Sequence, residues 1–197
     1  MINRKDSYFR RAQAENYVAR SAYKLLELNK KYNLIKKNDL VLDLGSSPGS
    51  WAQVCLKLGV KRVVGIDLSH TKIKDKDFRF IKDDIGNIDV KGMGNFNVVL
   101  SDIAPSTTGN FDAEASVDLS RKSWSIAKKV LKKNGNFLCK VFQGRGFEEF
   151  VKDVRKEFEF FKVSKPKASR KGSKEMYIIG RTFLGKTFTK NKKVYKG

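Results

Sequence analysis

From Leu40 onward, short apolar runs alternate with segments in which apolar residues recur every three or four positions. The runs predict seven strands, at residues 40–44, 62–67, 78–82, 97–102, 136–142, 160–164 and 176–181. The segments with helical spacing predict helices at residues 50–58, 117–133 and 147–158, the second ending at Asn134-Gly135. Strands that alternate with helices indicate an α/β fold with a mostly parallel sheet and helices on both faces.

The length of 197 residues suits a single domain with a sizeable core. We expect residues 1–37 to form a basic helical extension, residues 38–181 a core and residues 182–197 a basic tail. Because no apolar run approaches the roughly 20 residues of a membrane span, and the first residues lack the apolar stretch of a signal peptide, we expect a cytoplasmic protein that contacts no membrane. We also expect it to be a monomer.

The net charge of +21 is concentrated at the two ends of the chain. Residues 1–37 hold 10 basic and 3 acidic side chains, and residues 162–197 hold 12 basic and 1 acidic. The remaining residues, 38–161, carry a net charge of only +3. Two basic ends around a nearly neutral middle are typical of a surface that binds a polyanion. The alternative is a lysine enrichment that serves solubility or thermal adaptation.

The metal-binding residue types are sparse. Cys55 lies in a predicted helix and Cys139 in a predicted strand, and His70 is the single histidine. This set is too small and too widely spaced for a metal site or a redox pair. We therefore expect no metal, two buried thiols and a loop position for His70.

Unusual polar residues follow the predicted strands, where a parallel sheet binds its ligands. Residues 43–49, Asp-Leu-Gly-Ser-Ser-Pro-Gly, follow the first strand and begin a helix, and Asp67 ends the second strand. Glycines let a backbone approach a ligand closely, and a carboxylate at the second strand accepts hydrogen bonds from a ribose. The pair predicts an adenosine-containing ligand. The alternatives are a tight connection for the glycine turn and a turn-forming or helix-capping role for Asp67.

Further charged residues occupy the later strands. Asp83 and Asp84 end the third strand, where either could accept a hydrogen bond from an adenine amino group, and Asp102 ends the fourth. Lys140 lies inside the apolar fifth strand. Fully buried lysines are rare unless paired, so we interpret Lys140 as functional, against the alternative of an outward-facing residue on an edge strand. Glu175 is the one acid among the last 36 residues, so it is either a local salt-bridge partner or a functional residue.

Taken together, five segments resemble the FtsJ/RrmJ (RlmE-type) family of ribosomal RNA 2′-O-methyltransferases. They are Arg20-Ser-Ala-Tyr-Lys24, residues 43–51, Ser101-Asp-Ile-Ala-Pro-Ser-Thr-Thr-Gly109, Lys140-Val-Phe-Gln-Gly144 and residues 165–175. The resemblance runs from Tyr8 to Arg181, and Thr182 to Gly197 match nothing in the family. It implies a Rossmann-like methyltransferase fold, S-adenosylmethionine as cofactor and a uridine of large-subunit ribosomal RNA as target.

The resemblance also assigns site residues. It implies a catalytic tetrad of Lys24, Asp102, Lys140 and Glu175. It implies cofactor contacts from Gly49, Trp51, Asp67, Asp84 and Asp102, with Asp83 as the alternative to Asp84.

The implied chemistry requires a base for the ribose hydroxyl. A lysine accepts that proton only when its pKa is lowered, and burial and a neighbouring cation both lower it. Lys140 would be the base, Lys24 the neighbouring cation, and Asp102 would hold the ammonium or the attacking group. Glu175 would orient Lys24 or the ribose.

The basic ends would then bind RNA phosphates on either side of the ribose, with Lys165, Lys167, Arg170 and Lys171 as candidates. Tyr8, Phe9 and Tyr17 would either stack on a base or pack in the core. Three other functions remain open at this point: a tRNA 2′-O-methyltransferase, a non-catalytic RNA-binding protein and a nicotinamide-dependent oxidoreductase. The last would favour the G-x-G-x-x-G fingerprint, which the chain lacks.

Overall fold

The computed structural model describes residues 7–105, 112–170 and 172–185, which form five helices and seven strands. The helices are α1 (Ser7–Ala14), α2 (Ala22–Tyr32), α3 (Ser50–Lys57), α4 (Asp112–Val130) and α5 (Phe147–Arg155). The strands are β1 (Leu40–Leu44), β2 (Arg62–Asp67), β3 (Phe78–Lys82), β4 (Phe96–Ser101), β5 (Leu131–Phe142), β6 (Phe158–Ser164) and β7 (Glu175–Phe183).

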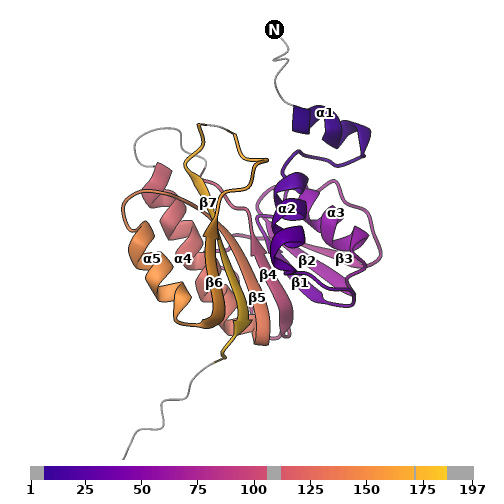
Figure 1. The fold of residues 1–197 in the computed structure, drawn as a ribbon. Coiled ribbons are helices and arrows are strands. Elements are labelled where there is room, and N and C mark those ends of the chain that lie inside the picture. Colours follow the sequence, from indigo (N-terminus) through magenta and orange to yellow (C-terminus); the bar gives the residue numbers. More distant parts are fainter. Residues whose placement is uncertain (1–6, 106–111, 171, 186–197) are drawn as a thin grey trace, which may run out of the picture.

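All seven strands belong to one sheet, in the order β3-β2-β1-β4-β5-β7-β6 (Figure 1). Strand β7 alone runs opposite to the other six strands, since it pairs antiparallel with both β5 and β6. The mostly parallel seven-stranded sheet predicted from the sequence is therefore confirmed. The strand order reverses between β1 and β4, and ligands of open α/β sheets bind beyond the carboxyl ends of the strands at such a point.

Helices cover both faces of the sheet, as Figure 1 shows for α2 and α3 on one side and α4 and α5 on the other. The alternation of side chains along β1 explains the two layers, because successive residues of a strand point to opposite faces. Val41 packs in the core beneath α2 and α3, whereas Leu42 and Leu44 pack in the core beneath α4 and α5. Within the described residues, no helix has the length and apolar character to cross a membrane.

The predicted bounds of two helices were wrong. Helix α4 begins at Asp112 rather than Val117, and α5 ends at Arg155, with Phe158 already in β6. The predicted end of α4 was also wrong. Helix α4 ends at Val130, and the residues interpreted as its end, Asn134 and Gly135, lie inside β5. Leu131 already pairs with Phe96 of β4, and the register shifts before pairing resumes at Asn136. Asn134 adopts a φ of 65° there, a left-handed conformation that asparagine tolerates better than most residues. Sheet pairing across the irregularity outweighs the local signal for a helix end.

The N-terminal helix packs through aromatic side chains. The ring of Tyr23 in α2 lies 5.6 Å from that of Tyr8 and 5.8 Å from that of Tyr17. Both rings therefore make the intramolecular contacts that the packing alternative predicted, while Phe9 is 52% exposed. Cys55 and Cys139 are buried free thiols, as expected.

Candidate active site

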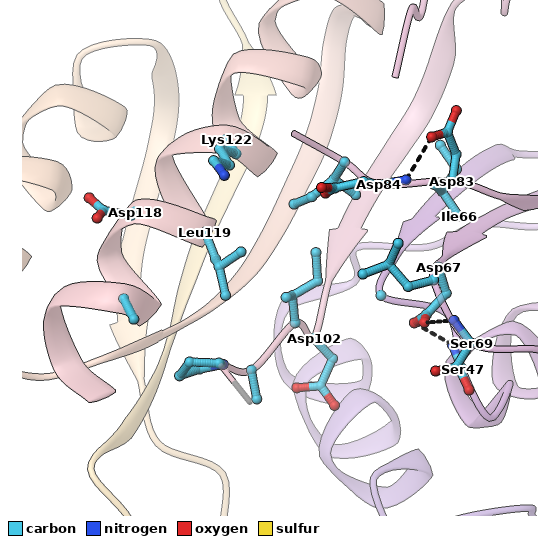
Figure 2. Close-up of a pocket in the computed structure, with 17 residues that line it drawn as sticks. Ser47, Ile66, Asp67, Ser69, Asp83, Asp84, Asp102, Asp118, Leu119 and Lys122 are labelled. Carbon is cyan, nitrogen blue, oxygen red and sulfur yellow. Dashed lines mark hydrogen bonds between the residues drawn. The ribbon is translucent and has the colours of Figure 1, made fainter. Parts of the chain in front are cut away.

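A cavity of about 710 Å³ opens where the strand order reverses. Its walls come from the segments that follow β1 to β4 and from α4, and Figure 2 shows the side chains that line it. The lining residues include Gly45, Ser47, Ile66, Asp67, Leu68, Asp83, Asp84, Ile85, Asp102, Ile103, Leu119 and Lys122. This volume lies within the range of small-molecule sites, which combine apolar walls with a few polar groups.

The glycine-containing turn after β1 is tied to the end of β2 through Asp67. The backbone N–H of Ser47 donates to one carboxylate oxygen at 2.9 Å, and that of Ser69 donates to the other at 2.7 Å (Figure 2). Asp67 is thus a turn former as well as a cavity residue. An ionised carboxylate has about four acceptor sites, so Asp67 keeps acceptor capacity for a ligand hydroxyl.

The turn itself needs glycine. Gly45 and Gly49 have φ values of 76° and 113°, in the region that favours glycine. A Cβ on Gly45 would collide with Ile103, and one on Gly49 with Ile73. These contacts explain the two glycines of the motif by close packing of the turn.

The two carboxylates after β3 differ in direction. Figure 2 shows Asp84 directed toward the cavity and α4, whereas the Asp83 carboxylate points away from the cavity. Asp83 accepts a hydrogen bond from the backbone N–H of Asp84 at 2.7 Å, and Asp84 accepts one from Gly86 at 2.8 Å. Both residues line the cavity, but the geometry favours Asp84 as the one that faces a ligand. Lys122 of α4, which the sequence analysis missed, also lines it.

Two predicted cofactor residues, Gly49 and Trp51, do not line this cavity. Trp51 is 3% exposed, and its indole N–H donates to the carbonyl of Ser21 at 3.0 Å. Its ring lies 6.1 Å from that of Tyr177. Trp51 therefore joins α3 to the start of α2 beneath the site, and its contact with a cofactor stays a prediction.

The four residues of the predicted tetrad form two ion pairs. The Nζ atom of Lys140 donates to the backbone carbonyl of Asp102 at 2.7 Å and lies 3.1 Å from its Oδ1. The Nζ atom of Lys24 donates to the carboxylate of Glu175 at 2.8 Å. Lys140 is 7% exposed on a strand paired on both sides, so the edge-strand alternative is wrong. Glu175 is not a local partner, because 151 positions separate it from Lys24.

Sheet register explains why these residues meet. In the antiparallel pairing of β5 with β7, Lys140 lies opposite Tyr177, and Glu175 is two residues before Tyr177. Opposed residues and residues two apart share a face of the sheet. Tyr177 packs in the core beneath α2, so this face presents Lys140 and Glu175 to the helix that carries Lys24.

Tyr177 connects the two pairs, and the sequence analysis missed it. Its hydroxyl donates to Oδ1 of Asp102 at 2.9 Å, and Lys24 Nζ lies 5.9 Å from the centre of its ring. Burial, with the charges of Asp102 and Glu175, raises the pKa of Tyr177 well above its ordinary value. The phenol therefore remains a donor at neutral pH. The signal available in the sequence was the two-residue spacing from Glu175 in a strand.

Two carboxyl groups of the site have shifted pKa values. Burial of Glu175 opposes its ionisation, but the hydrogen bond from Lys24 and the charges of Lys24 and Lys140 leave its pKa below the ordinary value. Burial raises the pKa of Asp43 to about 7, opposed by a hydrogen bond from Ser46 and reinforced by the charges of nearby carboxylates. Glu175 is thus ionised at neutral pH, whereas Asp43 titrates there.

Charged residues that hold one another beside a polar cavity can orient a nucleophile and move its proton. Within the described residues, no group of three His, Cys, Asp or Glu side chains is placed to hold a metal ion.

Comparison with known proteins finds relatives that cover almost the whole chain. The chain is 46% identical over 194 residues to "Ribosomal RNA large subunit methyltransferase E" of Methanothermobacter thermautotrophicus, with 93% of this chain and 92% of that protein covered. The protein of the same name from Archaeoglobus fulgidus is 43% identical, with 93% of this chain and 98% of that protein covered. A crystal structure of a putative ribosomal RNA methyltransferase from Plasmodium falciparum superposes with a TM-score of 0.75 at 27% identity, covering 86% of this chain and 100% of that one.

A putative hemolysin from Lactococcus lactis, at 19% identity and a TM-score of 0.60, shares the fold over 86% of this chain and 91% of its own. The model of one family, described as FtsJ-like methyltransferase, matches residues 17–183. That range contains the cavity and both ion pairs, and on this match and these identities the chain belongs to the FtsJ-like methyltransferase family.

Proposed function

We propose that this protein is an S-adenosylmethionine-dependent enzyme that methylates the 2′-oxygen of a uridine ribose in large-subunit ribosomal RNA. The observation that carries the proposal is the pair of ion contacts, Lys140 with Asp102 and Lys24 with Glu175, beside a cavity that Asp102 also lines. The names of the relatives that cover almost the whole chain support ribosomal RNA as the substrate.

The residues of the cavity fit the cofactor. Leu68 lines it with a side chain that is 64% exposed, and a bound adenosyl group would cover that apolar surface. Asp67 has acceptor capacity for ribose hydroxyls, and Asp84 for the amino group of an adenine. Ile85 and Ile103 supply apolar walls. Bound there, S-adenosylmethionine supplies a methyl group activated by its sulfonium charge.

The side chains next to the cavity act on the RNA hydroxyl. Lys140, once its ammonium has released a proton, takes the proton from the 2′-hydroxyl, and its Nζ is held by the carbonyl and the carboxylate of Asp102. Tyr177 fixes that carboxylate from the other side. Glu175 fixes Lys24, whose Nζ atom lies 5.9 Å from the centre of the Tyr177 ring. Such general-base assistance is worth roughly 10²–10⁴ in rate, and positioning supplies much of the remainder.

Methylation with isotopically labelled S-adenosylmethionine tests this function. Purified large-subunit ribosomal RNA, large subunits and bulk tRNA would each be incubated with the wild-type enzyme and with Lys140→Ala. We expect label at one uridine of the large-subunit RNA, on the ribose, and none with the variant. Substitution of that uridine by its 2′-deoxy form should abolish incorporation. Label on a base, or label confined to tRNA, would contradict the proposal.

We propose further that the enzyme acts as a cytoplasmic monomer. A single chain supplies all four tetrad residues and the cavity, so the site needs no second copy. Light scattering should give a mass close to the 22.4 kDa of one chain. A stable dimer would contradict this.

A further inference from the structure

A second, smaller pocket of about 240 Å³ adjoins the tetrad. Its lining consists of Arg20, Ser21, Lys24, Arg170, Ser173 and Glu175. It shares none of these residues with the cofactor cavity. Lys24 and Glu175 form part of its wall, and Tyr177 connects that wall to Asp102 in the larger cavity. The catalytic groups thus face two separate spaces.

The charge of the smaller pocket suits an anion. Three of its charged lining residues, Arg20, Lys24 and Arg170, are basic and one, Glu175, is acidic, so the lining carries a net positive charge. Each guanidinium presents several N–H donors in a plane, an arrangement that matches the oxygens of a phosphate. The hydroxyls of Ser21 and Ser173 add polar atoms to the lining.

The pocket is held together by contacts between its two sides. Arg20, just before α2, donates to the carbonyl of Ala168 at 2.7 Å. Glu27 of α2 accepts hydrogen bonds from the backbone N–H groups of Lys167 at 2.9 Å and of Ala168 at 3.3 Å. The segment that carries Arg170 is therefore fastened to the helix that carries Lys24. A group bound in the pocket would be held at a set position relative to the catalytic lysine.

The basic residues of this segment are not equivalent. The Lys165 ammonium donates to the carbonyl of Ser173 at 2.6 Å, so it closes the segment on itself. Arg170 is exposed and lines the pocket. Lys167 is exposed but is not part of the lining, and Lys171 lies outside the described residues. On charge alone, Lys165, Lys167, Arg170 and Lys171 would all have been assigned the same role in RNA binding.

We propose that this pocket binds a backbone phosphate of the RNA next to the target ribose. Arg20 and Arg170 contact the phosphate oxygens, and the phosphate sets the register that brings the 2′-hydroxyl to Lys24 and Lys140. The inference rests on the proposed function, because it assumes an RNA substrate whose ribose reacts at the tetrad. The inference adds to that function a site that binds the sugar-phosphate backbone of the RNA.

Arg170→Ala is the first test, because this side chain is exposed and its loss leaves the core intact. The KM for RNA should rise about 10-fold, because the variant loses one phosphate contact that is comparable in strength to a charge-assisted hydrogen bond. The value of kcat should fall by a much smaller factor. The slope of log affinity for RNA against log salt should become shallower by about 0.7 to 0.9. Arg170→Lys should restore the slope, since it keeps the charge.

Arg155→Ala is the matched control. Arg155 is an exposed arginine at the end of α5, which packs on the opposite face of the sheet from α2. The control should leave both KM and the salt slope at their wild-type values. If Arg155→Ala and Arg170→Ala change the slope equally, the contribution of Arg170 is general charge and the pocket is not a phosphate site.

A neutral linkage in the RNA identifies the phosphate itself. Substrates carrying a single methylphosphonate, placed in turn on each side of the target nucleotide, would be assayed with wild-type enzyme and Arg170→Ala. At one position the wild type should lose about 10-fold in KM, and Arg170→Ala should lose little more, because the two changes remove the same contact. Additive losses at both positions would overturn the proposal. Failure of wild-type enzyme to methylate unmodified RNA would instead refute the proposed function.

Discussion

Replacement of Lys140 by methionine separates the chemistry of the amine from the packing of its stem. Lys140 is 7% exposed within β5, and its Nζ atom makes both contacts with Asp102, at 2.7 and 3.1 Å. Methionine keeps an unbranched apolar side chain in the strand and removes only the ability to take a proton and to hold Asp102.

The expected loss follows from those contacts. Removal of a general base lowers the rate by roughly 10²–10⁴, which corresponds to about 3–5 kcal/mol of barrier. Loss of one partner from a fully buried ion pair destabilises a fold by about 3–5 kcal/mol. Asp102, however, has a side chain that is 16% exposed and keeps the hydrogen bond from Tyr177. We therefore expect a smaller loss of stability, about 1–3 kcal/mol, and a folded variant.

Single-turnover methyl transfer with labelled cofactor and saturating RNA measures the rate of the chemical step. Lys133→Met is the control, because Lys133 is an exposed lysine of the same strand, on the far side of the irregularity at Asn134. It should react at the wild-type rate. Calorimetry should show that Lys140→Met binds S-adenosylmethionine within about threefold of wild type, since Lys140 is not among the cavity-lining residues.

Two results would refute this reasoning. A Lys140→Met enzyme that keeps a tenth or more of the wild-type rate at neutral pH would exclude Lys140 as the base. A variant that loses cofactor affinity by the same factor as it loses rate would show that Lys140 acts on cofactor binding.

Three further predictions follow from the site. Asp67→Ala should weaken S-adenosylmethionine binding by about 1–3 kcal/mol, and unchanged affinity by calorimetry would exclude the ribose contact. Tyr177→Phe should fold and bind cofactor but lower the single-turnover rate by about 10-fold, because Asp102 loses a hydrogen bond; a wild-type rate would exclude this positioning role. For Asp43, burial raises the pKa from 3.8 to about 7, so the folded state binds more protons than the unfolded state between these values. The free energy of unfolding should therefore fall as pH rises through that window, by on the order of 4 kcal/mol from this group. Urea unfolding at about pH 5 and about pH 8 should show a smaller fall for Asp43→Asn than for wild type, and an equal fall would contradict the assignment.

Local patterns predicted the seven strands and distinguished the charged residues within and at the ends of the strands. Apolar runs bounded by turn residues predicted all seven strands, and the runs are clearest in the central strands, because a strand covered on both faces is apolar along its length. Charged residues were conspicuous for the same reason, since Asp102 and Lys140 interrupt or end such runs. The sequence therefore identified the residues whose burial requires a partner.

Contacts between distant segments could not be obtained in this way. The partner of Lys24 is 151 positions away, and only the antiparallel register of β7 against β5 brings Glu175 to the face that α2 covers. The hydroxyl of Tyr177 was overlooked because an aromatic residue in a strand is ordinarily part of the core. The side chains of Asp83 and Asp84 point in different directions because of the hydrogen bonds in the turn that follows β3. The pattern of apolar and polar residues does not predict those hydrogen bonds.

The sequence by itself thus determined the fold class, the family resemblance and the charged residues at the strand ends, because side-chain periodicity and the cost of burying charge are local properties. The tertiary structure decided which charges pair, that Trp51 supports the site from below, and that Arg20 and Arg170 share one pocket beside Lys24. These contacts depend on the tertiary structure because strand order and register, which depend on the whole chain, set the distances between side chains that are far apart in the sequence.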